Sequence, residues 1–254
     1  MAGKHRNPAY FCYQTFWTMI DWLYPPSCAG CGCSGSRWCS ICQSNTAQIG
    51  QQVCEQCGEP NNAAGICLLC QHSPPAFTAV RSWAIYGGAV RQALHALKYR
   101  QNIALGDTLS VPLLHLYNEL NWQIDIIVPV PLSNKRKRSR GYNQSALLAR
   151  PLSLAAGIPY RANALQRVRD TVSQVGLSGK ERSINVRGAF AAQSKFVRGK
   201  TILVIDDITT TGATIQNCAA ALLEAGAVNV YGLTVARAIP ETHNDSENNN
   251  SSTI

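Results

Sequence analysis

The sequence predicts a small cysteine-rich module followed by an α/β domain in which a mostly parallel sheet is flanked by helices. The runs 201–205 and 124–131 are almost entirely apolar or β-branched, as in the fully buried strands of parallel sheets. Helical periodicity follows later in the chain, and four C-x-x-C pairs occupy the N-terminal third. At 254 residues, the chain can bury one sizeable core beside a small module.

We expect three regions along the chain. An N-terminal helix and the cysteine-rich module occupy residues 1–75, the α/β domain occupies 76–240, and a tail covers 241–254. Ser73-Pro74-Pro75 marks the first boundary, because adjacent prolines interrupt regular structure. The tail has almost no core-forming residues, which predicts disorder.

The apolar, aromatic segment 11–24 is predicted to form an amphipathic helix that packs through Phe16, Ile20 and Leu23. Polar residues interrupt this segment, and it has no small-residue cleavage site. We therefore predict no signal peptide, no membrane insertion and a cytoplasmic protein. Cys12 and Cys218 lie on predicted helices and are expected to be small buried residues.

The cysteine pairs have the spacing of metal ligands. Each pair offers two thiolates from one turn, and two pairs complete a tetrahedral Zn²⁺ site. Four thiolates leave no position for water, so we predict two structural zinc sites. The alternative is a disulfide framework, which requires an oxidising compartment. The predicted ligands are Cys28, Cys31, Cys39, Cys42, Cys54, Cys57, Cys67 and Cys70.

The spacing leaves the pairing of these cysteines open. We favour sequential pairing, in which the first two pairs share one metal and the last two share the other, because it makes two short ribbons in tandem. Interleaved pairing is the alternative. Cys33 lies close to Cys31 and is a possible substitute ligand.

Alternating patterns organise the α/β domain. Strands are predicted over 81–86, 124–131, 201–205 and 228–236. Helices are predicted over 89–99, 105–120, 142–157 and 213–226. The polar, basic segment 161–198 is weakly periodic and is expected to form a flap over the ligand site.

The stretch VIDDITTTGAT (204–214) carries the strongest functional signal. It places Asp206 and Asp207 at the carboxyl end of a buried strand, where open α/β sheets bind ligands. The following loop, Thr209-Thr210-Thr211-Gly212-Ala213-Thr214, opens a helix, and helix N-termini bind anions. Because ionised carboxylates only accept hydrogen bonds, the pair favours hydroxyl groups. A ribose phosphate combines both features.

A basic segment follows the strand at 124–131. Lys135, Arg136 and Arg140 belong to a predicted loop over 132–141, and such side chains can hold pyrophosphate oxygens. The formal net charge of +9 arises in residues 76–240, since residues 1–75 carry equal numbers of acidic and basic side chains. A nucleic acid is the alternative polyanionic partner.

Three segments together resemble the ComF family of bacterial competence and DNA-utilisation proteins. They are VIDDITTTGAT, VPVPLSNKRKRSRGYNQ and LQRVRDTVSQ with ERSINVRGAF, and they follow the cysteine pairs. The first also resembles the phosphoribosyl pyrophosphate (PRPP) signature of type I phosphoribosyltransferases. The resemblance covers about residues 12–240.

The resemblance implies a double zinc ribbon followed by a type I phosphoribosyltransferase-like fold. In it, Asp206 and Asp207 bind the ribose hydroxyls and are the candidate catalytic residues. The loop 209–214 holds the 5′-phosphate, and Mg²⁺ accompanies the pyrophosphate beside 132–141. Arg182 is implied to close over the ligand from the flap. The implied partners are PRPP or a related ribose phosphate, single- or double-stranded DNA, and proteins of the competence machinery.

Three hypotheses remain after this comparison of residues. The protein is a phosphoribosyltransferase with an unknown acceptor, a PRPP-sensing protein without catalysis, or a nucleic-acid-binding adaptor. Binding to DNA weakens steeply with salt. Binding of PRPP instead depends on Mg²⁺ and on Asp206 and Asp207.

Overall fold

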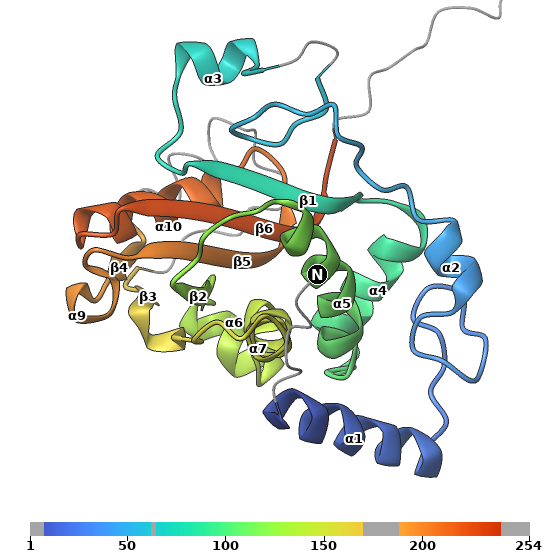
Figure 1. Ribbon diagram of the computed structural model, residues 1–254. Coiled ribbons are helices and arrows are strands. Elements are labelled where there is room, and N and C mark those ends of the chain that lie inside the picture. The colour runs from blue at the N-terminus through green and yellow to red at the C-terminus, as the bar shows by residue number, and fades with distance from the viewer. Residues whose placement is uncertain (1–7, 62–64, 170–187, 240–254) are drawn as a thin grey trace, which may run out of the picture.

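The computed structural model describes residues 8–61, 65–169 and 188–239 (Figure 1). The predicted tail 241–254 lies outside the described residues, as does the centre of the predicted flap with Arg182. The division of the chain at residues 75 and 240 stays a prediction.

A four-stranded parallel sheet forms the centre of the α/β domain. Its strands are β1 (Ala79–Ile85), β2 (Ile126–Pro129), β5 (Thr201–Thr209) and β6 (Asn229–Arg237), in the spatial order β1-β6-β5-β2. The predicted parallel sheet is confirmed. A separate antiparallel pair consists of β3 (Leu165–Arg167) and β4 (Phe190–Ala192), at the two ends of the predicted flap.

Helices cover both faces of the sheet (Figure 1). The helices of this domain are α4 (Gly88–Tyr99), α5 (Leu105–Glu119), α6 (Asn134–Arg140), α7 (Gln144–Ala156), α9 (Ser194–Val197) and α10 (Ala213–Glu224), with a 3₁₀ turn at Ala162–Ala164. On one face, Leu203 and Ile205 of β5 pack with α4, α5 and α7. On the other face, Ile202 and Val204 pack with α10. The alternation confirms that β5 is buried on both sides.

The cysteine-rich module packs along β1 and contains little regular structure. Its short helices are α2 (Ser40–Ser44) and α3 (Leu68–His72). Backbone hydrogen bonds attach it to β1 at two places. Ile49 N donates to Trp83 O over 3.0 Å, and Val80 N donates to Gln56 O over 2.7 Å.

The prediction of a loop over 132–141 is wrong, because residues 134–140 form helix α6. The Ser133 hydroxyl accepts a hydrogen bond from Arg136 N at 3.3 Å, which caps the N-terminus. Gly141 ends the helix with a φ of 79°, as is common after a helix C-terminus. Residues 134–140 have no apolar stripe, so hydrophobic periodicity could not predict this helix. Its ends are marked instead by the cap residues Ser133 and Gly141.

The N-terminal helix α1 (Pro8–Leu23) forms as predicted, but its packed face was predicted wrongly. Phe16 and Leu23 are exposed. Of the three predicted residues only Ile20 is partly buried, together with Tyr13 and Trp17. Cys12 is also exposed, contrary to expectation, while Cys218 is buried. Both faces of α1 are apolar, so composition could not decide which one packs. Among the residues that the structure describes, no helix is long and apolar enough to cross a membrane.

Candidate ligand pocket and cysteine clusters

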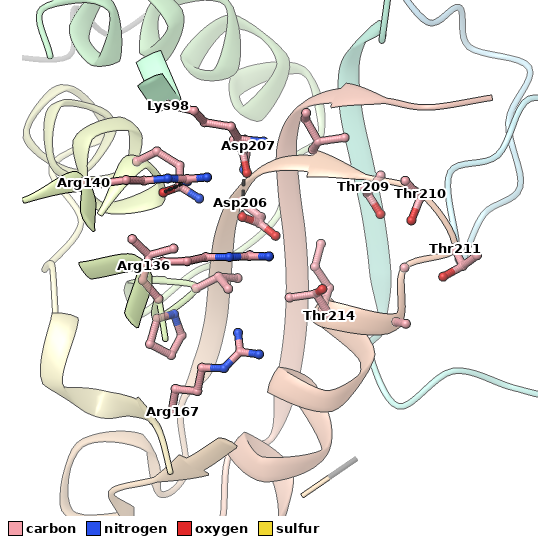
Figure 2. Close-up of a pocket in the computed structure, with 18 of the residues that line it drawn as sticks. Lys98, Arg136, Arg140, Arg167, Asp206, Asp207, Thr209, Thr210, Thr211 and Thr214 are labelled. Carbon is pink, nitrogen blue, oxygen red and sulfur yellow. Dashed lines mark hydrogen bonds and ion pairs between the residues drawn. The ribbon is translucent and has the colours of Figure 1, made fainter. Parts of the chain in front are cut away.

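The ligand pocket lies at the carboxyl end of β5 and has a volume of about 370 Å³ (Figure 2). Strand β5 continues through the acidic pair to Thr209, so only residues 210–212 form the turn before α10. The structure brings together most of the predicted ligand-binding residues. Those that line the pocket are Arg136, Arg140, Asp206, Asp207, Thr209, Thr210, Thr211, Gly212, Ala213 and Thr214.

The phosphate loop, residues 209–214, forms one side of the pocket (Figure 2). Gly212 adopts a φ of +76° immediately before α10, a conformation that side chains disfavour. The first N–H groups of α10 have no partners within the helix and carry its positive dipole end. The Thr209 hydroxyl is buried and has no hydrogen-bond partner among the described residues. The loop therefore offers donors for an anionic group.

The acidic pair is held by two neighbouring elements. The Ser145 hydroxyl at the start of α7 donates to Asp206 Oδ1 over 2.9 Å, and Asp207 N donates to the same oxygen over 2.9 Å. The Lys98 ammonium of α4 forms an ion pair with Asp207. Both carboxylates are buried. One cation thus faces two adjacent carboxyl groups in the ligand-free protein.

Burial, and to a smaller extent the neighbouring Asp207 charge, raise the pKa of Asp206 from its ordinary value of 3.8 to a net value of about 7. Hydrogen bonds from Ser145 and the Asp207 amide, and the charge of Lys98, oppose this shift. Burial lowers the pKa of Lys98, but attraction to Asp207 outweighs it, so the Lys98 pKa is raised overall. The pair therefore binds a proton near neutral pH and favours a further cation or a hydroxyl donor.

This arrangement predicts that the ligand-free protein loses stability as pH rises from about 4 to about 7. The folded state keeps the Asp206 proton until about pH 7, whereas the unfolded chain releases it near 3.8. The unfolded state then binds fewer protons, so the free energy of unfolding falls by about 4 kcal/mol across this window. Urea unfolding of zinc-saturated protein at pH 5 and pH 8 should show about 2–3 kcal/mol of this loss, because the unfolded chain has already released the proton at pH 5.

Asp206→Asn is the matched control for this pH dependence. The asparagine cannot titrate, but its carbonyl oxygen can still accept from Ser145. The variant should lose much less stability than wild type between pH 5 and pH 8. An equal loss in both proteins would show that Asp206 does not titrate in this window.

Basic side chains line the wall of the pocket opposite the phosphate loop (Figure 2). Arg140 donates to Gln144 Oε1 and to the Tyr99 hydroxyl, each over 3.2 Å. Among the described residues, neither Arg136 nor Arg140 forms an ion pair with a carboxylate. These two guanidinium groups are available for a second anion. Lys135 is exposed and does not line the pocket, because it lies on another side of α6.

Sequence reasoning missed four polar residues of this site: Lys98, Ser145, Gln144 and Arg167. Each comes from an element distant in sequence from the acidic pair. Lys98 had a weak signal, since it is the basic residue in the last turn of its helix. Arg167 lies near the start of the predicted flap (161–198), and its guanidinium carbon lies over the Phe190 ring, 5.4 Å from the ring centre.

The second cysteine cluster consists of Cys54, Cys57, Cys67 and Cys70. Their four Sγ atoms all lie within 4.8 Å of one another. The Cys57 and Cys67 sulfurs are 3.8 Å apart, which equals the separation of about 3.8 Å expected for two thiolates bound tetrahedrally to Zn²⁺ at about 2.3 Å. The four thiols therefore fit a closed structural zinc site.

The first cysteine cluster brings five thiols together. The Sγ atoms of Cys28, Cys31, Cys33 and Cys39 lie within 4.8 Å of one another. The Cys42 thiol is outside this group of four, but it is a hydrogen-bond neighbour of the Cys28, Cys31 and Cys39 thiols. The structure thus groups the pairs sequentially, as favoured, and Cys33 joins the four predicted ligands of this cluster. This cluster also fits a zinc site.

Backbone amides favour thiolates in both clusters. Cys39 N donates to Cys28 Sγ over 3.4 Å, and Cys67 N donates to Cys54 Sγ over 3.3 Å. Burial raises the pKa of Cys28 and of Cys54, but backbone N–H groups outweigh it and lower each pKa to about 6. Burial and the neighbouring thiols raise the pKa of Cys42 and of Cys70, so a metal that binds these clusters must displace protons from some of its ligands.

Comparisons with known proteins agree with this organisation. A family model for the double zinc ribbon domain matches residues 19–71. DNA utilization protein YhgH of Escherichia coli O6:H1 is 32% identical over 207 residues, which cover 79% of this chain and 90% of that protein. Competence protein ComFC of Bacillus subtilis is 26% identical over 251 residues, which cover 93% of this chain and 97% of that protein.

Among solved structures, glutamine phosphoribosylpyrophosphate amidotransferase from B. subtilis is 25% identical with a TM-score of 0.33. The alignment covers 54% of this chain, which spans only 26% of that enzyme. The sequence relatives, in contrast, are matched over at least 90% of their own length. With its double zinc ribbon, its parallel α/β domain and its identity to these relatives, the chain belongs to the ComF family of competence and DNA-utilization proteins.

Proposed function

We propose that this protein binds PRPP, or a closely related ribose phosphate, together with Mg²⁺ in the ligand pocket. One observation carries the proposal, which is that three complementary groups of side chains line a single cavity (Figure 2). The phosphate loop suits the 5′-phosphate, the acidic pair suits the ribose hydroxyls, and Arg136 with Arg140 suits the pyrophosphate.

The same arrangement supports transfer of the phosphoribosyl group to an acceptor. In that reaction a nucleophile bonds to the anomeric carbon of the sugar as the bond to pyrophosphate breaks, and pyrophosphate leaves with the bonding electrons. Mg²⁺ bound to the pyrophosphate supplies positive charge. Arg136 and Arg140 neutralise charge on the departing group, and Asp206 and Asp207 orient the sugar. The nature of the acceptor is a separate question from binding.

Calorimetric titration of zinc-loaded protein with PRPP and Mg²⁺ tests the binding proposal. Wild type should bind, and Asp206→Asn/Asp207→Asn should lose most of the affinity, because the amides cannot replace two charged acceptors. Charge-assisted hydrogen bonds contribute about 1.5–3 kcal/mol each, so a loss of about 100-fold is expected. Absence of binding by folded wild type would refute the proposal.

Two substitutions on α6 test the assignment of the subsites. Arg136→Met should weaken PRPP by about tenfold or more, yet leave ribose 5-phosphate unchanged, because only PRPP carries the pyrophosphate. Lys135→Met is the matched control on the same helix, and it should change neither affinity. Equal effects of Arg136→Met on both ligands would place the pyrophosphate elsewhere.

Release of pyrophosphate separates an enzyme from a sensor. Candidate acceptors are incubated with protein, PRPP and Mg²⁺, and pyrophosphate is measured. Acceptor-dependent release that Asp206→Asn/Asp207→Asn loses supports a transferase. Tight binding of PRPP without release of pyrophosphate in the presence of any tested acceptor supports a PRPP-sensing protein.

A role in DNA uptake or utilization, with direct contact to DNA or to competence proteins, is the second candidate function. The names of the relatives and the positive charge of residues 76–240 favour it. Binding of single- and double-stranded oligonucleotides should then fall linearly on a logarithmic scale as salt rises. It should also survive Asp206→Asn/Asp207→Asn, which removes negative charge. Oligonucleotide binding that PRPP and Mg²⁺ displace would place both ligands in one site.

A further inference from the structure

The second cysteine cluster and the phosphate loop are joined by one buried arginine. Arg237 ends β6 beside Thr209 of β5, and it is 2% exposed. Its Nη1 donates to Thr210 O over 3.2 Å, and its Nη2 donates to Cys57 O. A single guanidinium group thus fixes a carbonyl of the phosphate loop and a carbonyl of a predicted zinc ligand.

The turn that contains Cys57 is pressed against β1. A Cβ atom on Gly58 would lie 2.2 Å from Val80 O, so a side chain at this position cannot fit without movement. Val80 N in turn donates to Gln56 O over 2.7 Å. Contacts with β1 therefore fix one side of this turn, and the thiols of the second cluster hold the opposite side.

The segment that leaves the second cluster also contacts the phosphate loop. The Phe77 ring is buried and lies 3.7 Å from where a Cβ atom on Gly212 would be. Ala76 N donates over 2.7 Å to Gln216 Oε1 on the first turns of α10. The loop and the start of α10 are therefore supported from behind by the segment that leaves the second cluster.

Within the described part of the chain, the first cluster makes no comparable contact with the phosphate loop. It reaches β1 near Trp83 and Ala84, through Ile49 N to Trp83 O and Ile85 N to Ala47 O. Among the described residues, none between 26 and 50 lines the ligand pocket. The two clusters are similar in chemistry but differ in what they support.

We propose that metal binding at the second cluster positions the phosphate loop through Arg237, and that metal binding at the first cluster does not. Without the metal, the turn at Cys57 loses its fixed position, and Arg237 loses the two groups that orient it on that side, the Cys57 carbonyl and the Glu59 carboxylate, which lies 3.4 Å from its Nη1. Thr210 then loses a fixed donor, and the loop opens more often. Arg237 is a positioning residue, and metal at the second cluster becomes a requirement for binding a 5′-phosphate.

Two double substitutions compare the clusters directly. Cys67→Ser/Cys70→Ser removes one C-x-x-C pair from the second cluster, and Cys39→Ser/Cys42→Ser removes the corresponding pair from the first. The two pairs are matched in local structure. In each, the first cysteine is the N-cap of a five-residue helix and the second lies within that helix. Metal analysis should show that each variant loses one zinc. Hydrogen exchange by mass spectrometry then reports the amides of 209–214, with α7 as the indicator of global folding.

The second-cluster variant should exchange at 209–214 about tenfold faster than wild type, which corresponds to an opening free energy lower by about 1.4 kcal/mol. The first-cluster variant should exchange there like wild type. Equal exchange in all three proteins, or equal acceleration in both variants, would overturn the proposal. This measurement needs no ligand, so it stands apart from the proposed function.

Arg237→Lys tests the link if the second-cluster variant unfolds throughout. An ammonium keeps the charge but lacks the planar fork that reaches two carbonyl groups at once. The variant should retain both zincs and normal exchange in α7, yet exchange about tenfold faster at 209–214. Wild-type exchange at 209–214 in this variant would refute the role of Arg237.

The ligand arm of this inference rests on the proposed function. Affinity for ribose 5-phosphate should fall about tenfold in Cys67→Ser/Cys70→Ser and in Arg237→Lys, and should not change in Cys39→Ser/Cys42→Ser. If wild type does not bind ribose 5-phosphate, the proposed function fails while the exchange result still decides the coupling. If wild type binds and all variants bind equally, the coupling fails and the function stands.

Discussion

Lys98→Met is expected to destabilise the ligand-free protein by about 3–5 kcal/mol at pH 8, as is usual when one partner is removed from a buried ion pair. The Lys98 side chain is 19% exposed and that of its partner Asp207 is 6% exposed, and Asp206 is adjacent to Asp207. Methionine leaves two adjacent buried carboxylates without a cation. Urea unfolding of wild type and variant at pH 8 measures the difference.

The effect of Lys98→Met should shrink at pH 5. The pKa of Asp206 is raised to about 7, so at pH 5 this carboxyl group is protonated and only Asp207 lacks a counter-charge. The double variant Lys98→Met/Asp207→Asn should recover part of the lost stability at pH 8, because one buried charge is removed. Equal destabilisation by Lys98→Met at pH 5 and pH 8 would contradict this explanation.

Lys200→Met is the control for loss of a lysine charge. Lys200 precedes β5 at the other end of the same strand, is 49% exposed, and lies 3.9 Å from Asp125. An exposed ion pair of this kind contributes about 0–1 kcal/mol. A large effect at Lys200, or a small one at Lys98, would show that burial does not govern the strength of these pairs.

Removal of zinc is expected to unfold the region 26–72 while the α/β domain keeps its core. Apparent free energies of zinc binding reach about 10–16 kcal/mol in small zinc domains, which is comparable to or larger than the stability of a whole domain. The cysteine-rich module buries few large side chains apart from its own thiols. The α/β domain, in contrast, has an extensive apolar cluster on each face of its sheet.

Hydrogen exchange before and after treatment with a strong chelator checks this prediction. Amides of 26–72 should lose protection, while those of α5, α7 and β5 should retain most of it. Zinc should be released in an amount close to two equivalents, one for each cysteine cluster. Full protection of 26–72 in metal-free protein would contradict a structural role for zinc.

Local patterns in the sequence were sufficient for the features that depend on neighbouring residues. The spacing of the C-x-x-C pairs predicts two clusters of thiols, because two ligands three residues apart fit one metal. The order strand, acidic pair, threonine loop and helix predicts a ligand site at the carboxyl end of β5. In each of these features the residues concerned lie close together along the chain, so local chain geometry constrains them.

Features that depend on packing were predicted less well. Phe16 and Leu23 were predicted to lie on the packed face of α1, yet they are exposed, whereas Trp17 contacts the Arg37 guanidinium and Tyr13 is partly buried. Helix α6 was taken for a loop because its residues are charged, and Lys135 was grouped with Arg136 although only the arginine lines the pocket. A helix separates adjacent residues by about 100°, so neighbours in sequence can face different surroundings.

The sequence by itself determined that a cysteine-rich metal module precedes a parallel α/β domain, and that Asp206, Asp207 and the phosphate loop lie together. Only the tertiary structure decided which distant residues complete the site. Lys98 reaches Asp207 and Ser145 reaches Asp206, while Arg237 connects Thr210 to Cys57. Such contacts follow from the order of strands in the sheet and the packing of helices on it, which no short segment encodes.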